Sequence, residues 1–381
     1  MTTPRDMRFE SCDLGSLKAG LPSHLYFDPA AYTAELQAIW YRQWLYVCRS
    51  HVLAQPGDFR VFRIGTQSIL VVRDKDASLH AFHNTCVHRG SILCEAESGQ
   101  LPGKRIVCPY HRWTYALNGE LISVPFLDTG GSEKGIALYK VALREWGGNI
   151  FVNLAGDADT HIEDNAEPGL DVLAHWPLAE LRVAHTYENR LACNWKVFWE
   201  NFVECYHCPG THPGLCRMVP LYQQTFTSVT DRLAALGVAE GVADGIESWT
   251  TDGKAHGPIF PGLTADERDI GHTFLTLLPT MFVVAHRDYV RQVSILPLGA
   301  ELTLVRSEWL FSEAALSDPG FDSQPAVDFV TNLLQEDARV CELNQRGLQA
   351  IPHQQGRLVP QEDEVIRFHE WYRTGMNRKA G

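Results

Sequence analysis

The sequence predicts an α+β protein in which an antiparallel β domain is inserted early in a larger domain of mixed structure. Two observations predict this class. Between residue 59 and about residue 154, short stretches of branched and aromatic residues alternate with turn residues, whereas helical spacing of apolar residues precedes and follows this part. The length of 381 residues also exceeds what a single core usually holds. We therefore expect three segments, 1–44, 45–155 and 156–381.

The first helix is predicted to begin at Asp28, an N-cap residue followed by Pro29, and its apolar spacing continues to Trp44. Five strands are predicted next, and Asn118-Gly119 indicates a hairpin turn between strands. The runs that predict these strands are FRVFRIG, QSILVVRD, LHAFHN, RWTYAL and NIFVNL.

After the β domain, residues 155–175 are acidic and rich in Ala, Gly and Asp, which predicts a surface connection. Helical spacing returns between Asn194 and about Cys205. Several strands are expected between about 273 and 311, followed by a helix from about Pro325 to Leu348.

The composition argues against several classes of protein. The net charge of −13 does not suit a nucleic-acid-binding protein, whose affinity rests on Lys and Arg. No apolar run approaches the ~18–20 residues that span a bilayer, and the first residues lack the pattern of a signal peptide. We therefore expect no membrane association and a cytoplasmic location. There the ten cysteines are expected to stay reduced, as core residues and metal ligands rather than disulfides.

Two short arms within the β domain each contain a cysteine and a histidine. Cys86 and His88 form the first arm, and Cys108 and His111 form the second after a gap of 19 residues. Two thiolates and two imidazoles suit either a tetrahedral zinc ion or a Rieske [2Fe–2S] cluster. Zinc modules usually pair two cysteines and then two histidines, whereas here each arm offers one of each. The order favours a Rieske cluster, in which both cysteines bind one iron and both histidines bind the other.

A second group of metal-capable residues follows Asn194. His207 and His212 are separated by Pro209-Gly210, which is expected to break the helix and turn both imidazoles toward one metal ion. Two histidines and one carboxylate form the facial triad of non-haem Fe(II) oxygenases. The expected carboxylate is Asp337 on the late helix, with its neighbour Glu336 as a rival that spacing alone does not separate.

Three cysteines crowd the same segment. Soft thiolate ligands are unsuited to an iron that activates O₂, so we expect these cysteines to be packing residues. They are Cys205, Cys208 and Cys216.

With these motifs, the chain resembles the catalytic α subunits of Rieske non-haem iron oxygenases, the aromatic-ring-hydroxylating superfamily. CVHRG, CPYHRW, NWK, EN, YH and THP occur in family order, and the likeness covers nearly the whole chain. The resemblance implies a Rieske domain at 45–155 inserted in a helix-grip (START-like) catalytic domain made of 1–44 and 156–381. It also implies the metal ligands. The cluster ligands would be Cys86, His88, Cys108 and His111, and the ligands of a mononuclear Fe(II) would be His207, His212 and Asp337.

The family resemblance also implies a role for Glu204, one helical turn before His207. In the family a carboxylate at this place carries electrons between the cluster of one subunit and the iron of the next, so a homotrimer is expected. Ring-hydroxylating dioxygenases usually have Asp there. Glu in the context ECYHC, with the late EDARVCELNQRGL, resembles the branch that acts on glycine betaine, carnitine and stachydrine.

The resemblance implies an enzyme that uses O₂ to hydroxylate a substrate C–H bond. We expect monooxygenation and N-demethylation of a quaternary ammonium compound such as glycine betaine. The alternative is hydroxylation of an aromatic ring or an aromatic acid, as a monooxygenase or dioxygenase, and Arg291 could pair with a substrate carboxylate under either hypothesis. The chain has no convincing dinucleotide fingerprint, so NAD(P)H would act through a separate reductase, with or without a ferredoxin. An electron carrier with the cluster alone, and a zinc-stabilised binding module, are the hypotheses from other classes.

Overall fold

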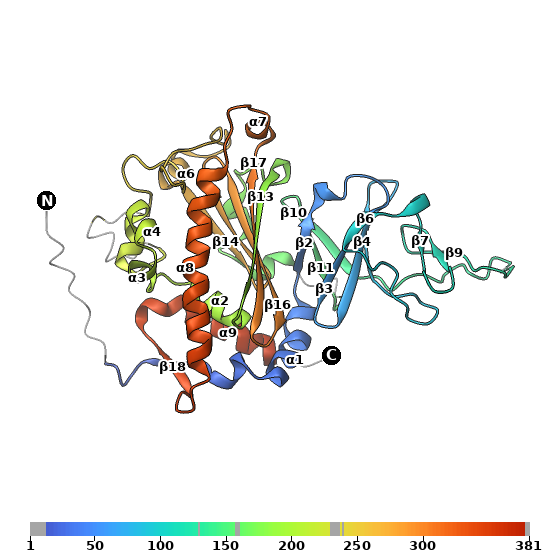
Figure 1. The fold of residues 1–381 in the computed structure, drawn as a ribbon, viewed down its shortest axis with the longest axis horizontal. Coiled ribbons are helices and arrows are strands. Elements are labelled where there is room, and N and C mark those ends of the chain that lie inside the picture. Colours follow the sequence, from blue (N-terminus) through green and yellow to red (C-terminus); the bar gives the residue numbers. More distant parts are fainter. Residues whose placement is uncertain (1–12, 129, 157–160, 229–236, 238–239, 378–381) are drawn as a thin grey trace.

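An antiparallel sheet of six strands forms the centre of the larger part of the molecule, and the long helix α8 crosses one of its faces (Figure 1). A smaller all-β part lies beside it (Figure 1). This arrangement confirms the predicted α+β class, with an antiparallel β domain set into a helix-grip domain. The computed structural model describes residues 13–128, 130–156, 161–228, 237 and 240–377.

The central sheet has the strand order β12-β14-β15-β16-β17-β13, and all neighbouring strands are antiparallel. The strands expected between about 273 and 311 are confirmed as its four middle members. The strands of this sheet are β12 (Ala166–Glu167), β13 (Arg182–Leu191), β14 (His272–Leu277), β15 (Met281–His286), β16 (Val290–Gly299) and β17 (Leu302–Phe311).

The two faces of this sheet separate two sets of buried side chains. Residues opposite one another on neighbouring strands lie on the same face, and the register aligns Phe274, Val284, Arg291 and Trp309. We call the face that carries these four residues the inner face; helices α2 and α8 cover it. The opposite, outer face packs against the β domain and the segment around Trp176. A site between this sheet and the helices would therefore have the inner face as one of its sides.

Helix positions follow local sequence signals. The side chain of Asp28 accepts a hydrogen bond from the main-chain N–H of Ala30, which confirms the predicted start of α1. This helix ends at Ala38 rather than Trp44, and a tighter turn then directs Trp40 edge-on against Trp195. The α-helices are α1 (Pro29–Ala38), α2 (Trp195–Phe202), α3 (Cys208–Thr211), α4 (Pro213–Met218), α6 (Ala265–Ile270), α7 (Glu313–Leu316), α8 (Gln324–Leu348) and α9 (Asp363–Asn377).

Short 3₁₀ turns connect many of these elements. Within the described residues, no helix is both long and apolar enough to cross a membrane. The 3₁₀ turns are η1 (Ser23–Tyr26), η2 (Trp40–Arg42), η3 (Ser50–Val52), η4 (Pro102–Lys104), η5 (Ile162–Asn165), η6 (Leu170–Leu173), η7 (Leu178–Glu180), η8 (Pro220–Gln224) and η9 (Pro360–Glu362).

The smaller part contains three antiparallel sheets, ordered β5-β4-β3-β6, β10-β11-β2 and β7-β8-β9. All five strand runs expected from sequence form strands there. The predicted turn at Asn118-Gly119 joins β8 to β9, and Gly119 adopts a φ of +89°, which favours glycine. The strands are β2 (Leu45–Arg49), β3 (Asp58–Ile64), β4 (Gln67–Arg73), β5 (Leu79–His83), β6 (Ser98–Gln100), β7 (Ile106–Val107), β8 (Thr114–Tyr115), β9 (Leu121–Ser123), β10 (Ala142–Trp146) and β11 (Asn149–Asn153).

The prediction that residues 155–175 form a surface connection is wrong in part. Residues 157–160 lie outside the described residues, but the following segment buries Ile162 and Leu173 and contributes β12 to the edge of the central sheet. These two apolar side chains are anchors that the acidic composition of the segment concealed. A further small sheet pairs β1 (Lys18–Pro22) with β18 (Gln355–Leu358), so the first described strand lies against the last part of the chain.

A buried carboxylate, Glu35 on α1, joins three helices that are distant in sequence. Its oxygens accept hydrogen bonds from Lys196 Nζ at 2.6 Å, from the indole N–H of Trp195 at 2.8 Å and from the hydroxyl of Tyr372 at 2.9 Å. Lys196 also donates to the main-chain oxygen of Leu25 at 2.9 Å. Both charged side chains are 0% exposed, so α1, α2 and α9 are held together by charges that water does not reach.

We expect Lys196→Met to lower the free energy of unfolding by about 3–5 kcal/mol, because it leaves Glu35 buried without its cationic partner. Urea unfolding followed by tryptophan fluorescence measures the change. The matched control is Arg306→Gln, which removes a partly exposed ion pair with Glu188 and should cost only about 0–1 kcal/mol. Equal unfolding curves for the two variants would contradict the structural role of this pair.

Candidate active site

Three side chains from the catalytic part of the chain converge on one point. His207 and His212 flank α3, and Asp337 lies on α8, 125 residues beyond His212. Asp337 Oδ1 lies 2.8 Å from His212 Nε2 and 3.4 Å from His207 Nε2, and the two Nε2 atoms are 3.3 Å apart. One ligand atom from each residue lies within 4.8 Å of the others, which is the arrangement a single ion requires.

The local sequence brings the histidines together in a way that differs from the expectation. Pro209 and Gly210 do not separate the histidines by a break; both lie inside the single turn of α3, with His207 before it and His212 after it. Proline is accommodated because it occupies the first turn, where its missing N–H costs nothing. The helical break instead falls between the end of α2 and His207, so α3 acts as a rigid spacer between the two imidazoles.

Two glutamates fix the orientation of these imidazoles. His207 Nδ1 donates to Glu204 Oε1 at 2.6 Å, and His212 Nδ1 donates to Glu336 Oε2 at 2.7 Å. A histidine whose Nδ1 is held in this way presents Nε2 to a metal. Glu336 therefore contacts the side of His212 that faces away from Asp337. This geometry supports Asp337 as the metal ligand and gives Glu336 an orienting role.

The charges in this group stabilise one another. Burial opposes the charged form of Asp337, but hydrogen bonds from the two histidines outweigh it and hold the pKa of the carboxyl below its usual value. Burial also lowers the pKa of His207, yet its contacts with Asp337 and Glu204 raise that pKa to about 9. The pKa of His212 is raised in the same way, by Asp337 and Glu336 against burial. The negative potential of these carboxylates also favours the binding of a divalent cation between the two imidazoles and Asp337.

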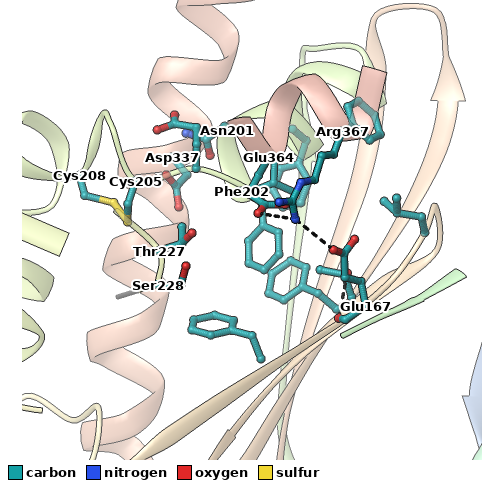
Figure 2. A pocket seen from close by; sticks show the side chains of 18 of the residues that line it. Glu167, Asn201, Phe202, Cys205, Cys208, Thr227, Ser228, Asp337, Glu364 and Arg367 are labelled. Atoms are coloured by element: carbon teal, nitrogen blue, oxygen red, sulfur yellow. Dashed lines mark hydrogen bonds and ion pairs between the residues drawn. A yellow bond between two sulfur atoms is a disulfide. The ribbon is translucent and has the colours of Figure 1, made fainter. Parts of the chain in front are cut away.

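A cavity of about 730 Å³ opens beside this group. Its walls come from α2, the inner face of the sheet, α8 and α9. Arg367 stands at its margin, where it pairs with Glu167 of β12 and Glu364 of α9 (Figure 2). Apolar and aromatic side chains form much of the lining, among them Phe198, Phe202, Phe274, Phe282 and Trp371.

Two cysteines of this region are paired, contrary to expectation. Cys205 and Cys208 form a disulfide, and Figure 2 shows it on the opposite side of the cavity from Arg367. The predicted packing role holds for Cys216, which is buried and free. The separation of three residues, with the chain turning into α3 between them, places the two Cα atoms 4.9 Å apart, close enough for a bond.

The two Cys/His arms form a second group, in the β domain. Cys86 and Cys108 are each 2% exposed, whereas His88 lies at the surface. The rings of His88 and His111 are 4.7 Å apart between centroids. The hydroxyl of Tyr115 lies 3.1 Å from Cys86 Sγ. Buried thiols beside partly exposed imidazoles fit a cluster that is bound by sulfur on its inner side and by nitrogen on its outer side.

The two histidines and one carboxylate therefore fit a mononuclear Fe(II), and the two cysteines and two histidines of the arms fit a [2Fe–2S] cluster. The structure brings together all the residues predicted for each site, but their ligand roles stay predictions. Three features of the sites are not predictable from the motifs alone. They are the orienting role of Glu336, the contact of Tyr115 and the position of Asn201, whose side-chain nitrogen lies 3.3 Å from His207 Nε2. The role of Glu336 was predictable in principle from its position next to Asp337. Adjacent residues on a helix point in different directions and can contact different sides of one imidazole.

Comparisons with known proteins identify both parts of the chain. A model described as "Rieske [2Fe-2S] domain" matches residues 43–142, and one described as "Ring hydroxylating alpha subunit (catalytic domain)" matches residues 178–378. The glycine betaine monooxygenase oxygenase subunit of Pseudomonas aeruginosa PAO1 is 30% identical, over 95% of this chain and 90% of that protein. The chloroplastic choline monooxygenase of Beta vulgaris is 30% identical, over 92% of this chain and 75% of that protein.

Among solved structures, the quaternary ammonium Rieske monooxygenase CntA in complex with L-carnitine superimposes with a TM-score of 0.70. The match covers 97% of this chain and 100% of that one, at 23% identity. At this level of identity the comparison establishes a shared fold.

We expect Asp337→Asn to abolish Fe(II) binding at the three-residue site, because the amide lacks the anionic oxygen that faces both Nε2 atoms. Glu336→Gln keeps an acceptor for His212 Nδ1 and should weaken binding by about 10–100-fold while full stoichiometry is still reached. Anaerobic Fe(II) titration of the purified variants measures both effects. Normal binding by Asp337→Asn, together with loss in Glu336→Gln, would make Glu336 the ligand.

Proposed function

This chain belongs to the Rieske-type ring-hydroxylating oxygenase α subunits, with a [2Fe–2S] domain and a non-haem iron catalytic domain, and on that premise we propose that it monooxygenates a quaternary ammonium compound. The observation that carries the proposal is the likeness, over 95% of the chain, to a glycine betaine monooxygenase oxygenase subunit. The reaction proposed is hydroxylation of an N-methyl group. The alternative, hydroxylation of an aromatic ring or aromatic acid, is not favoured by these relatives.

The lining of the cavity supports a cationic substrate. A quaternary ammonium group has no proton to donate, so aromatic faces and negative potential must recognise it. Aromatic rings from α2, β14 and β15 line the cavity together with the carboxylate of Glu204. The carboxylates of Glu167 and Glu364 also line it, paired with Arg367. The net charge of −13 favours the approach of a cation as well.

Each residue of the proposed site has a distinct task. We propose that His207, His212 and Asp337 hold Fe(II) and that Glu204 and Glu336 keep the two imidazoles oriented. When bound, the mononuclear iron supplies activation of O₂ and the cluster supplies single electrons. The apolar side chains of α2 and α9 exclude water from the space where the substrate would lie.

The proposed overall reaction balances with one O₂, two electrons and two protons for each N-methyl group. One oxygen atom enters the C–H bond and the other leaves as water. The resulting N-hydroxymethyl group then loses formaldehyde and a proton, because the nitrogen takes back the C–N bonding electrons. The products are formaldehyde and the demethylated tertiary amine.

Electron supply is proposed to come from outside the chain. A separate NAD(P)H reductase, directly or through a ferredoxin, would reduce the cluster bound by Cys86, His88, Cys108 and His111. Glu204 would then carry the electron from the cluster of a neighbouring subunit to His207, which requires an oligomer, and we propose a homotrimer. Its side chain already holds His207 Nδ1, which supports that role. A cytoplasmic location remains part of the proposal.

We expect the protein, with a surrogate reductase and NADH, to release formaldehyde from glycine betaine or L-carnitine in proportion to the NADH oxidised. Formaldehyde assay and mass spectrometry of the amine product measure this stoichiometry. His207→Ala is the control, since it should keep the visible spectrum of the cluster and release no formaldehyde. Formation of a phenol or cis-diol from aromatic substrates, with no reaction of any quaternary ammonium compound, would overturn the proposal.

We expect Glu204→Gln to slow oxidation of the reduced cluster in a single turnover by more than ~100-fold, beyond what loss of an orienting carboxylate causes. Glu336→Gln is the matched control, because it removes the equivalent carboxylate from the other histidine. Stopped-flow absorbance of the cluster gives both rates. If the two variants slow the rate equally, Glu204 only orients His207 and does not carry electrons.

A further inference from the structure

The inner face of the sheet carries a buried cation, Arg291 on β16, that lines the cavity. Its side chain projects from the same face as Phe282 and Trp309 and lies 5.4 Å over the ring of Phe282. Arg291 is only 5% exposed. Burial lowers the pKa of its guanidinium to about 10, so the group stays charged at neutral pH.

Within the described part of the chain, Arg291 has no hydrogen-bond or ion-pair partner, and its Nε is among the buried atoms without one. Asp337 is the carboxylate whose attraction acts on it, but that carboxylate is engaged by the two histidines. Buried arginines are almost always paired, since removing a charge from water is costly.

Another buried arginine of the same chain shows what a structural role requires. Arg49 is 1% exposed, and its guanidinium donates four hydrogen bonds, to the main-chain oxygens of Gly147, Leu178 and Leu181 and to the side chain of Asn149. The Nε of Arg49 is also buried without a partner, so the two arginines differ at their terminal nitrogens, which the fold pairs in Arg49. Arg291 lacks such partners and faces a cavity instead.

A second donor that lines the cavity also lacks a partner within the described residues. It is the indole N–H of Trp249, which is buried and makes no hydrogen bond. A guanidinium and an indole N–H only donate hydrogen bonds. A ligand group that only accepts, and carries negative charge, complements this set best.

We propose that Arg291 is the anchor of a carboxylate-binding subsite, so that the substrate is a betaine, a molecule with a quaternary ammonium group and a carboxylate. This proposal rests on the proposed function and narrows it. A carboxylate can form two parallel hydrogen bonds with a guanidinium, which fixes both the position and the direction of the substrate. The ammonium end would then be turned away from Arg291, toward the carboxylates and aromatic rings of the cavity.

The test compares ligands that differ in the carboxylate alone. Isothermal titration of the metal-loaded protein under anaerobic conditions is made with glycine betaine and choline, and with L-carnitine and its methyl ester. The proteins are the wild type, Arg291→Gln, Arg291→Lys and Arg306→Gln. Arg306 is the matched control because it lies on the outer face of the same sheet, paired with Glu188.

For wild type and Arg306→Gln, we expect the carboxylate form of at least one pair to bind more tightly than its counterpart without the carboxylate. Arg291→Gln should raise the dissociation constant of the carboxylate ligand by about 10–100-fold and leave that of choline or the ester unchanged. Arg291→Lys keeps the charge but cannot form two parallel hydrogen bonds. Its dissociation constant for the carboxylate ligand should lie between those of the wild type and Arg291→Gln. In turnover, KM should rise by a similar factor while kcat changes little.

Thermal unfolding separates binding from folding. Arg291→Gln should be at least as stable as the wild type, because it removes an unpaired buried charge. A fall in its melting temperature comparable to that of Lys196→Met would show a structural role and overturn the proposal. Equal loss of affinity for both members of a pair, or unchanged affinity for the carboxylate ligand, would also overturn it.

Failure of the proposed function gives a different result. If wild type neither binds nor demethylates any quaternary ammonium compound, the same proteins are titrated with benzoate and benzyl alcohol. Benzoate binding that depends on Arg291 would uphold the carboxylate subsite while the proposed function fails. Binding of benzoate that is independent of Arg291 would overturn the subsite as well.

Discussion

Burial of the Glu35 carboxylate against Lys196 is the interaction on which the arrangement of the catalytic part depends. The carboxylate receives hydrogen bonds from α2 and α9 while standing on α1, so it joins the start, the middle and the end of the chain. Helix α2 leads directly into the loop with Glu204 and His207, and α9 closes one side of the cavity. Because neither charge reaches water, the three helices are held in one relative position, and the loop that carries Glu204 and His207 starts from that fixed position.

The polar groups around the proposed iron site form a layered arrangement. The Nε2 atoms of His207 and His212 face Asp337, and each Nδ1 faces a glutamate, so both edges of each imidazole are occupied. On the inner face of the sheet, a buried guanidinium supplies positive charge to the same cavity. Among the described residues, the site therefore combines negative charge around the proposed metal with one buried positive group, Arg291, because Arg367 at the margin is paired with Glu167 and Glu364. This asymmetry suits a substrate with two opposite charges.

Much of this architecture was predictable from sequence, for identifiable physical reasons. The Cys/His arms are short and local, so the order of cysteine and histidine in each arm favoured the cluster over zinc, and strong caps such as Asp28 marked helix starts. Spacing could not separate Glu336 from Asp337, because the choice depends on which way each side chain points from α8 relative to a loop 125 residues away. Sequence could equally not show that Arg291 has no hydrogen-bond or ion-pair partner among the described residues, since this follows from the register of β15, β16 and β17 and from which side chains approach them. The acidic composition of 155–175 did not indicate strand β12, because two buried apolar residues, Ile162 and Leu173, fix the position of this segment.

The bond between Cys205 and Cys208 closes a small covalent ring that includes His207. Both cysteines are buried, with exposures of 7% and 2%. If a reagent such as dithiothreitol, added to protect an iron–sulfur protein, reduces this bond, it opens the ring at the loop that carries His207. Protein purified with and without such a reagent would then differ in covalent structure at this loop. Iron content and spectra from separate preparations are comparable only when the number of titratable thiols has been counted in each.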